Sequence, residues 1–409
     1  MSPLSNPKSA APPAPSASFR HARPLVLAEA LQAARNYTLS IFDCLAAAGY
    51  DVPARVPRIA TLNPPLWELG HMAWFAEWFV LREAGSSHPA AAERHSLLTR
   101  GDDWFDSNLV PHHARWTLEL PSSGAIKTYC HEVLDRVIDK LSREAGEDAA
   151  LYPYRLALAH EDMHGEALLY TLQTLGVAAP AGWAREQPVL APAQPICYPG
   201  GTIVMGAAQQ GGFVFDNEKM AHPCYVAPFE IDASLVTNAQ YAEFMADGGY
   251  QKRQFWSVAG SAWLMQQERS SPRYWQRDGA QWRSTRFDRL QTLAGAEPVR
   301  HLSLYEAQAY CAWIGRCLPT EAQWEYAALA GQAGFRWGQL WEWTASPFEP
   351  YPGFEADRYR EYSAPWFMTH QVLRGASFAT PARFASPRFR NFFRPERDDM
   401  FCGFRTCSY

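Results

Sequence analysis

A stretch rich in proline and alanine near the middle of the chain separates two halves whose sequence patterns differ. Residues 177–198 have the composition of an interdomain linker. Residues 23–176 contain long segments whose apolar side chains recur at helical spacing, which predicts a helical domain. Residues 199–409 contain short strand-like runs separated by frequent glycine and tryptophan, which predicts an α+β domain. The fold class expected from this pattern is α plus α+β, in two domains.

Length, charge and cysteine content exclude several classes of protein. With 409 residues the chain is long enough for two buried cores. Its net charge of −5 provides no basic surface, and no segment is apolar for about 18 residues, so neither nucleic acid nor a membrane is an expected partner. Residues 1–22 lack the apolar run of a secretory signal and are expected to be a disordered tail. The eight cysteines, without a C-x-x-C pair, then indicate reduced thiols and a cytoplasmic location. The oligomeric state is left open.

Four helices are predicted in the first half, which favours a four-helix bundle. The first covers residues 24–48, and the second follows the Asn63-Pro64-Pro65 start signal and runs to residue 85. The third covers residues 125–143, the fourth includes residues 156–171, and residues 86–121 are expected to be a loop. Bundles build metal sites from inward-facing side chains on separate helices. In the second half, helices are predicted at residues 237–246, 304–314 and 320–330.

Histidines in two of these helices are candidate metal ligands. His160 and His164 are four residues apart, so both imidazoles project from one helix face. Glu166 lies beside that face, where a carboxylate would hold the second ring nitrogen of a ligand. His71, in the second predicted helix among aromatic residues, would complete a set of three if it faces inward. The alternative is that these histidines are ordinary core residues of a packed helix interface.

The fourth helix also matches the zinc-protease pattern H-E-x-x-H, with Glu161 as the general base. That interpretation needs a further ligand, and the next histidine is His222, beyond the proline-rich linker. A glutamate from elsewhere would also serve, so a zinc hydrolase remains an alternative. A non-catalytic binding protein is a further alternative.

Several motifs occur in order along the second half: GGTIVMG from residue 200, LPTEAQWEYAA from residue 318, VLRGASF from residue 372 and CGFR from residue 402. On these motifs the second half resembles the formylglycine-generating-enzyme (sulfatase-modifying factor) family, whose fold is C-type-lectin-like. The first half resembles a DinB-type four-helix bundle, whose three-histidine site corresponds to His71, His160 and His164.

The two halves in this order are similar to the ergothioneine-biosynthesis sulfoxide synthases and to the related selenoneine synthases. The resemblance implies a non-haem iron(II) oxidoreductase that uses dioxygen to join sulfur or selenium to the imidazole of hercynine, the Nα-trimethylated histidine. Three neutral imidazoles leave about half of the positions of an octahedral iron open. The same three ligands also suit zinc, so Fe(2+) as the cofactor rests on the resemblance.

The resemblance also implies roles for residues of the second half. Tyr359 corresponds to the catalytic tyrosine, which donates a proton or a hydrogen, and Tyr362 to a residue that contacts hercynine. Asn391 corresponds to the residue that bonds the carboxylate or amine region of hercynine, and Phe392 to a wall of the pocket. Because a trimethylammonium group cannot be hydrogen-bonded, aromatic faces are its expected partners.

Other positions depart from the family pattern and bear on the second substrate. Met163 stands where some members have a glutamine that contacts the substrate, and Phe393 where members using γ-glutamylcysteine have an aspartate. Arg115 and Arg397 remain as candidate donor-binding residues. The sequence is most similar to the selenoneine synthases, so the expected donor is a selenosugar, whose hydroxyl groups need neutral partners. A sulfoxide synthase that uses cysteine or γ-glutamylcysteine is the alternative.

The second half also invites comparison with the formylglycine-generating oxidases themselves. Their chemistry needs a metal-binding cysteine pair shortly after the RGGS-like motif. After the matching residues 374–377, this chain has Thr380 and Ala385 at those places. The sequence therefore argues against that activity.

Overall fold

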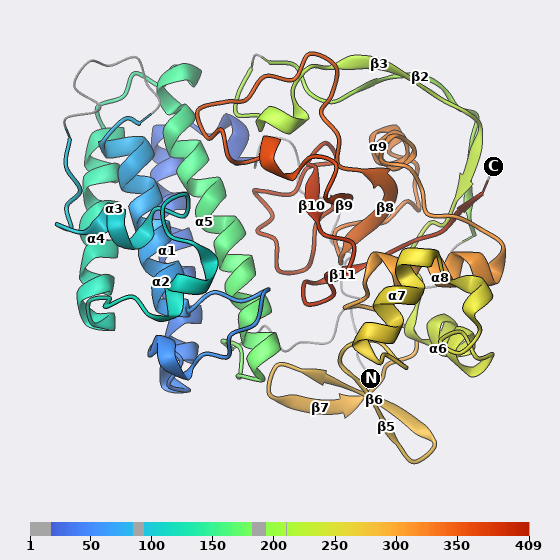
Figure 1. Cartoon of the computed structure of the whole chain (residues 1–409). Helices are drawn as coiled ribbons and strands as arrows, with labels where there is room; N and C mark the ends of the chain where they lie inside the picture. Colours follow the sequence, from blue (N-terminus) through green and yellow to red (C-terminus); the bar gives the residue numbers. More distant parts are fainter. Residues whose placement is uncertain (1–17, 85–93, 182–193, 210, 409) are drawn as a thin grey trace, which may run out of the picture.

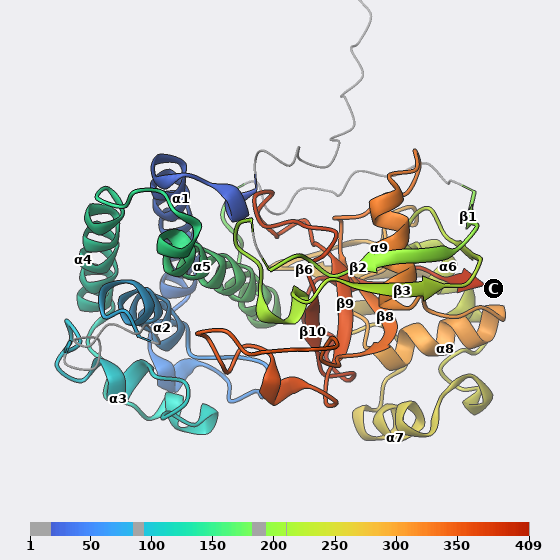
Figure 2. The same cartoon turned by 90° about the horizontal axis from the view of Figure 1, so that it is seen from above.

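The computed structural model describes residues 18–84, 94–181, 194–209 and 211–408. Long helices of the N-terminal half fill one end of the molecule, and sheets with shorter helices fill the other (Figure 1). The view from above shows the same division, with α5 (Asp148–Leu175) between the remaining long helices and the sheets (Figure 2). The predicted combination of a helical half and a sheet-containing half is confirmed.

Four long helices make up the N-terminal half, as predicted: α1 (Pro24–Ala47), α2 (Pro65–Ala76), α4 (Ser123–Leu141) and α5. Both α4 and α5 pack against α1 and α2. The apolar side chains that predicted α1, among them Leu27 and Leu31, are buried in this interface. Shorter segments complete the half: Phe19–His21, Pro53–Arg55 and His112–Trp116 are 3-10 helices, Glu77–Leu81 is a π-helix, and Gly101–Phe105 is α3.

Local sequence explains where α2 and α5 begin and end. Pro65 occupies the first position of α2, where a backbone N–H would have no helical acceptor. α2 continues directly into the π-helix, so the predicted second helix is confirmed up to Arg82, its C-cap. α5 extends beyond residues 156–171 at both ends and stops at Gly176, whose φ of 65° suits glycine. The predicted loop at residues 86–121 is wrong in part, because α3 and a 3-10 helix lie within it.

In the described part of the C-terminal half, the strands form four small sheets. Their strand orders are β10-β9-β8-β11, β1-β4-β12, β2-β3 and β5-β6-β7. In the first sheet β10, the strand nearest α5 in Figure 1, pairs antiparallel with β9, while β11 pairs parallel with β8. The strands are β1 (Ile196–Tyr198), β2 (Gly201–Met205), β3 (His222–Val226), β4 (Phe229–Ile231), β5 (Trp275–Asp278), β6 (Gln281–Arg286), β7 (Arg289–Thr292), β8 (Trp341–Pro347), β9 (Gln371–Gly375), β10 (Asn391–Phe393), β11 (Cys402–Gly403) and β12 (Cys407–Ser408).

The helices of this half are α6 (Asn238–Ala246), α7 (Val258–Gln267), α8 (Leu304–Ile314) and α9 (Glu321–Ala330). The three predicted helices correspond to α6, α8 and α9, and Thr237 and Thr320 cap two of them as side-chain acceptors. α7 and the β5-β6-β7 sheet were not predicted. α7 leaves Val258 92% and Met265 63% exposed, so it lacks the clean apolar stripe from which a helix is recognised.

The ends of the predicted tail and linker need correction. Residues 18–22 are not disordered: Phe19 is buried and stacks on Phe384, and Arg20 forms a buried ion pair with Glu218. These contacts remove an aromatic ring and a charge from water together, which orders the segment. β1 lies inside the predicted linker and pairs with β4. Residues 1–17 of the predicted tail and 182–193 of the predicted linker lie outside the described residues, and the predicted domain boundaries otherwise stay predictions.

Two further expectations concern the chain as a whole. All eight cysteines are free thiols, as predicted from their spacing. Among the described residues, no helix combines the length and the apolar character that a membrane crossing requires.

Candidate active site

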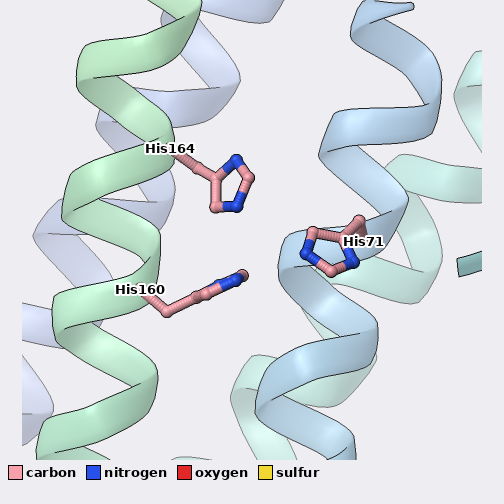
Figure 3. A group of neighbouring side chains, drawn as sticks. All are labelled: His71, His160 and His164. Atoms are coloured by element: carbon pink, nitrogen blue, oxygen red, sulfur yellow. The ribbon is translucent and has the colours of Figure 1, made fainter. Parts of the chain in front are cut away.

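The three predicted ligand histidines come together between α2 and α5. His71 of α2 faces His160 and His164 of α5 (Figure 3). One ring nitrogen from each side chain lies within 4.8 Å of the other two. The ring centroids are 4.4 Å apart for the α5 pair, and 5.1 and 5.2 Å from His71 to His160 and His164. The helical spacing of four residues therefore presents two imidazoles to a third one, as predicted.

Hydrogen bonds set the orientation of two of these rings. The Nδ1–H of His71 donates to the backbone carbonyl of Phe105 at 2.8 Å, which leaves Nε2 bare. The Nδ1 of His164 lies 2.7 Å from Oε1 of the buried Glu68, and this bond fixes its ring in the same way. Both Nε2 atoms are thereby available as ligands.

His160 provides the observation that most favours a metal at this place. The residue is 2% exposed, and neither of its ring nitrogens has a hydrogen-bond partner among the described residues. Its ring lies flat against Phe75, with centroids 3.5 Å apart and planes 2° from parallel. A buried imidazole without a partner is costly unless something else binds its nitrogen. The donor set therefore fits a transition-metal ion, which three neutral imidazoles bind well.

Burial keeps His71 and His160 neutral. Desolvation, with the neighbouring His164 acting in the same direction, lowers the pKa of His71 to about 3. Desolvation and both neighbouring histidines also hold the pKa of His160 well below its ordinary value. A neutral imidazole is the form that binds metals, so His71 and His160 are in their ligand form at neutral pH.

This shift predicts how the metal-free protein responds to acid. Unfolded His71 binds a proton below its ordinary pKa of 6.5, whereas the folded residue stays neutral down to about pH 3. Unfolding therefore takes up a proton over this range, and stability is expected to fall as the pH drops below 6.5. The expected slope is about 1.4 kcal/mol per pH unit for each such histidine. Urea unfolding across this range, in wild type and His71→Gln, measures it, and equal slopes for both proteins would contradict the prediction.

Glu166 does not hold a ligand ring, contrary to the prediction. Its carboxylate accepts hydrogen bonds of 2.6 to 2.8 Å from Tyr170 of α5 and from three side chains of the C-terminal half. Those three donors are Trp341, Ser377 and Thr380. Glu166 sits two residues beyond His164, which turns it toward the sheets rather than toward α2. Its role in the structure is to join the two halves.

The residue that does hold a ligand ring, Glu68, was missed. It lies three residues before His71 on α2 and is 2% exposed. A lone acid in an otherwise apolar helix, one turn from a histidine, was a signal that the sequence contained. The carbonyl of Phe105, which holds His71, carried no such signal, because any residue has that group.

Glu161, which would be the general base of a zinc hydrolase, does not face the three histidines. Its carboxylate faces α1, where it pairs with the buried Arg35 at 2.6 and 2.9 Å and accepts a hydrogen bond from Thr38 at 2.8 Å. The bonds to Arg35 and Thr38 hold the Glu161 carboxylate against α1, away from the three histidines. The H-E-x-x-H match therefore arises from a structural ion pair beside two ligands.

A cavity of about 300 Å³ lies beside the triad, between α5 and the C-terminal half. Its enclosure by elements of both halves matches the usual position of a ligand site at a domain boundary. Ten of the predicted site residues line it: His160, Met163, His164, Glu166, Tyr359, Tyr362, Asn391, Phe392, Phe393 and Arg397. His71 lies on the far side of the triad, and Arg115 is not among the lining residues.

The two predicted tyrosines lie at the triad end of this cavity. The ring of Tyr359 is edge-on to Phe75, at 5.0 Å, and 6.2 Å from the ring of His160. Tyr362 stacks on Phe215 at 4.6 Å and directs its hydroxyl to the sulfur of Met163 at 3.7 Å. Burial raises the pKa of both phenols, so both keep their protons at neutral pH.

Comparison with known proteins places the chain. Residues 181–340 and 336–408 match the family of sulfatase-modifying factor enzyme 1-like domains. The hercynine oxygenase of Mycolicibacterium thermoresistibile is 30% identical, covering 93% of this chain and 94% of that relative. The hercynine oxygenase of Mycolicibacterium smegmatis is also 30% identical, over 93% of this chain and 97% of its own length. The chain belongs to the hercynine oxygenase family. The formylglycine-generating enzyme of Streptomyces coelicolor is 36% identical, but covers only 40% of this chain.

In this member of the hercynine oxygenase family, the wall of the cavity opposite α5 is built by β10. Asn391 and the two phenylalanines after it form that strand, which pairs with β9. Phe392 stacks on Phe348 at 4.1 Å, and its ring is 5.7 Å from that of Tyr362. The Asn391 side-chain oxygen accepts the N–H of Phe392 at 2.9 Å, which leaves its amide N–H2 group to face a ligand.

The two arginines predicted for the donor are both engaged elsewhere. Arg397 lines the cavity, but its guanidinium bonds Asp399 at 2.6 and 2.8 Å and lies 4.7 Å above the ring of Phe393. Arg115 donates to Asn63 at 2.7 Å and stacks on Trp67 at 3.8 Å. Burial lowers the pKa of Arg115 to about 10. Neither guanidinium is left free as a carboxylate clamp.

Asp162 is a further cavity residue that sequence analysis missed. It lies on α5 between the two ligands, is buried, and pairs with Arg383 of the C-terminal half. Burial raises the pKa of Asp162 to about 7, with Arg383 acting in the opposite direction. The sequence around Asp162 does not show what its carboxylate binds. Only the position of Arg383 in the structure shows that Asp162 joins the two halves.

Proposed function

We propose that this chain is a non-haem iron(II), dioxygen-dependent synthase that forms a C–Se bond between a selenosugar and the imidazole ring of hercynine. The observation that carries the proposal is the triad of imidazoles, two of them buried, at the wall of a cavity rich in aromatic rings. The relatives named hercynine oxygenases support the substrate. The free cysteines support a reducing compartment such as the cytoplasm.

His71, His160 and His164 would hold the iron, with Glu68 and the carbonyl of Phe105 orienting two of the rings. When bound, iron(II) supplies the activation of dioxygen that side chains cannot provide. The unpaired nitrogens of His160 support a bound metal of some kind, and family membership supports iron over zinc. We also propose that the helical half is a DinB-like four-helix bundle.

Hercynine is expected to bind against β10 and Tyr362. The trimethylammonium group needs aromatic faces, and Phe392 and Tyr362 line the cavity 5.7 Å apart. The amide of Asn391 is placed to bond the carboxylate of hercynine. This position leaves the imidazole of the substrate free to point toward the triad.

Tyr359 is proposed to hold the proton that the reaction consumes. Burial raises the pKa of its phenol, and nearby Glu361 and Asp106 act in the same direction. A phenol that stays protonated beside the triad is suited to donate a proton at a defined atom.

The substitution Tyr359→Phe is therefore expected to keep substrate binding and to divert the reaction toward oxidation of the chalcogen donor. The ratio of coupled product to oxidised donor, measured by mass spectrometry, checks this outcome. Tyr362→Phe is the matched control, because its hydroxyl points at the sulfur of Met163. An unchanged product ratio in Tyr359→Phe would assign the proton to another group.

The assignment of a selenosugar as the chalcogen donor is supported by the lack of free charged groups in the cavity that could bind an amino acid. Phe393 places a ring where an ammonium group of γ-glutamylcysteine would need a carboxylate, and Arg397 is already neutralised by Asp399. A charged amino acid would leave a buried charge uncompensated there. A sugar carries hydroxyl groups that neutral partners satisfy, and a selenolate is a soft metal ligand that ionises readily.

A competition experiment tests the donor. Hercynine, iron(II) and dioxygen are supplied together with cysteine, γ-glutamylcysteine and a selenosugar, and the products are quantified. Preference for the selenosugar is expected. Preference for either thiol would overturn the C–Se assignment in favour of an ergothioneine-type sulfoxide synthase. Absence of any product, with hercynine still bound in calorimetry, would favour a non-catalytic binding protein.

A further inference from the structure

A second cavity of about 290 Å³ reaches the triad from the side opposite the substrate cavity. Its inner part is made by α2, the π-helix that follows it and the loop that carries Tyr359. The inner side chains are His71, Trp74, Phe75, Trp78, Phe79 and Tyr359. This cavity has no part in the binding of hercynine described above.

The first cavity borders His160 and His164 and the second borders His71, so both cavities border the triad. Tyr359 lines both of them, His71 lines the second, and Phe75 lies between the second cavity and His160, against whose ring it stacks. A small molecule in the second cavity would therefore lie beside the triad without passing through the space assigned to hercynine and its donor.

The inner surface of the second cavity suits an apolar ligand. The indole N–H of Trp74 donates to Asp102 at 2.7 Å, and the Nδ1–H of His71 donates to the Phe105 carbonyl, so neither N–H is free to bind a ligand in the cavity. Trp74 and Phe79 are buried, so their rings supply apolar surface with no water-exposed edge. Polar side chains such as Asn108, Arg360 and Glu361 are exposed and stand at the outer rim. Apart from the half-buried Asp106 and Ser107, a polar ligand would find few partners beyond that rim.

We infer that the second cavity admits and holds dioxygen, a small apolar gas, next to the triad. The inference rests on the proposed function, in which two organic substrates occupy the first cavity and dioxygen must also reach the triad. A route that avoids that cavity lets the gas reach the triad after both substrates are bound. Tyr359, which lines both cavities, then stands between the gas and hercynine.

The test fills the second cavity from two independent positions. Ser107→Trp and Ala84→Trp each place an indole into it from the wall. Leu109→Trp is the matched control, because Leu109 is on the same loop as Ser107, is 68% exposed and does not line the cavity. Crystals of the metal-free protein under xenon pressure report apolar gas binding, and initial rates at varied dioxygen report access.

Xenon is expected in the second cavity of wild type and Leu109→Trp, and not in the two filled variants. The filled variants are expected to show a several-fold rise in KM for dioxygen with KM for hercynine unchanged. Absence of xenon from the wild-type cavity, or an unchanged KM for dioxygen in both filled variants, would overturn the inference. If wild type consumes no dioxygen with any donor, the proposed function fails, and the dioxygen assignment fails with it.

Discussion

His160→Ala is expected to abolish metal binding and all turnover. The substitution removes one of three ligands whose nitrogens lie within 4.8 Å of each other, and it leaves a void against Phe75. Two imidazoles on separate helices hold a divalent ion far more weakly than three. Metal content after anaerobic loading with iron(II), measured by elemental analysis together with dioxygen uptake, checks the outcome.

Two controls sharpen this result. His131→Ala removes an exposed histidine of α4 and should leave iron content and turnover unchanged. Glu161→Gln should also keep the iron, since the carboxylate of Glu161 faces Arg35 and not the triad. A zinc hydrolase would instead lose its activity with Glu161. Wild-type metal stoichiometry in His160→Ala would refute the assignment of the triad.

Arg35→Met is expected to lower the free energy of unfolding by about 3 to 5 kcal/mol, since it leaves the carboxylate of Glu161 buried without a counter-ion. Arg35 and Glu161 are 1% and 3% exposed and bonded at two points. Thr38 then remains as a single neutral donor to a buried charge. Urea unfolding of the metal-free protein at neutral pH measures the effect.

The double variant Arg35→Met/Glu161→Met tests whether the loss of stability comes from the unpaired charge of Glu161. Because it removes both charges, it should recover most of the stability that the single variant loses. The matched control is Arg136→Met, which breaks an exposed i, i+4 pair with Glu132 and should change stability by less than about 1 kcal/mol. If Arg35→Met cost no more than this control, the buried pair would have no structural importance.

The helix predictions, and the predicted proximity of the three histidines, are confirmed where local sequence carries the physical cause. The spacing of His160 and His164 is a property of the α-helix itself, so their shared face follows from their positions four residues apart. The four long helices could be predicted because their apolar residues recur at helical spacing over many turns, so a few exceptions do not hide the pattern. α7 and the β5-β6-β7 sheet failed for the opposite reason, because they are short and much of their surface is exposed.

Family resemblance supplied residues that no local pattern would have selected. Tyr359, Tyr362 and Asn391 lie in irregular segments or in a three-residue strand, and all three line the cavity beside the triad. Their proposed roles still await the experiments above. Arg115 shows the limit of such transfer, since Asn63 and Trp67 occupy its guanidinium outside the cavity.

The sequence by itself determined which helix carries two candidate ligands, where α1 and α2 begin, and that two differently patterned halves meet near residue 177. Only the tertiary structure decided what each acidic residue of α5 does. Glu161, Asp162 and Glu166 lie within six residues, yet they bond Arg35 of α1, Arg383, and donors of the sheet-containing half respectively. A carboxylate is assigned by the partner that faces it, and each of these partners is more than 100 residues away along the chain.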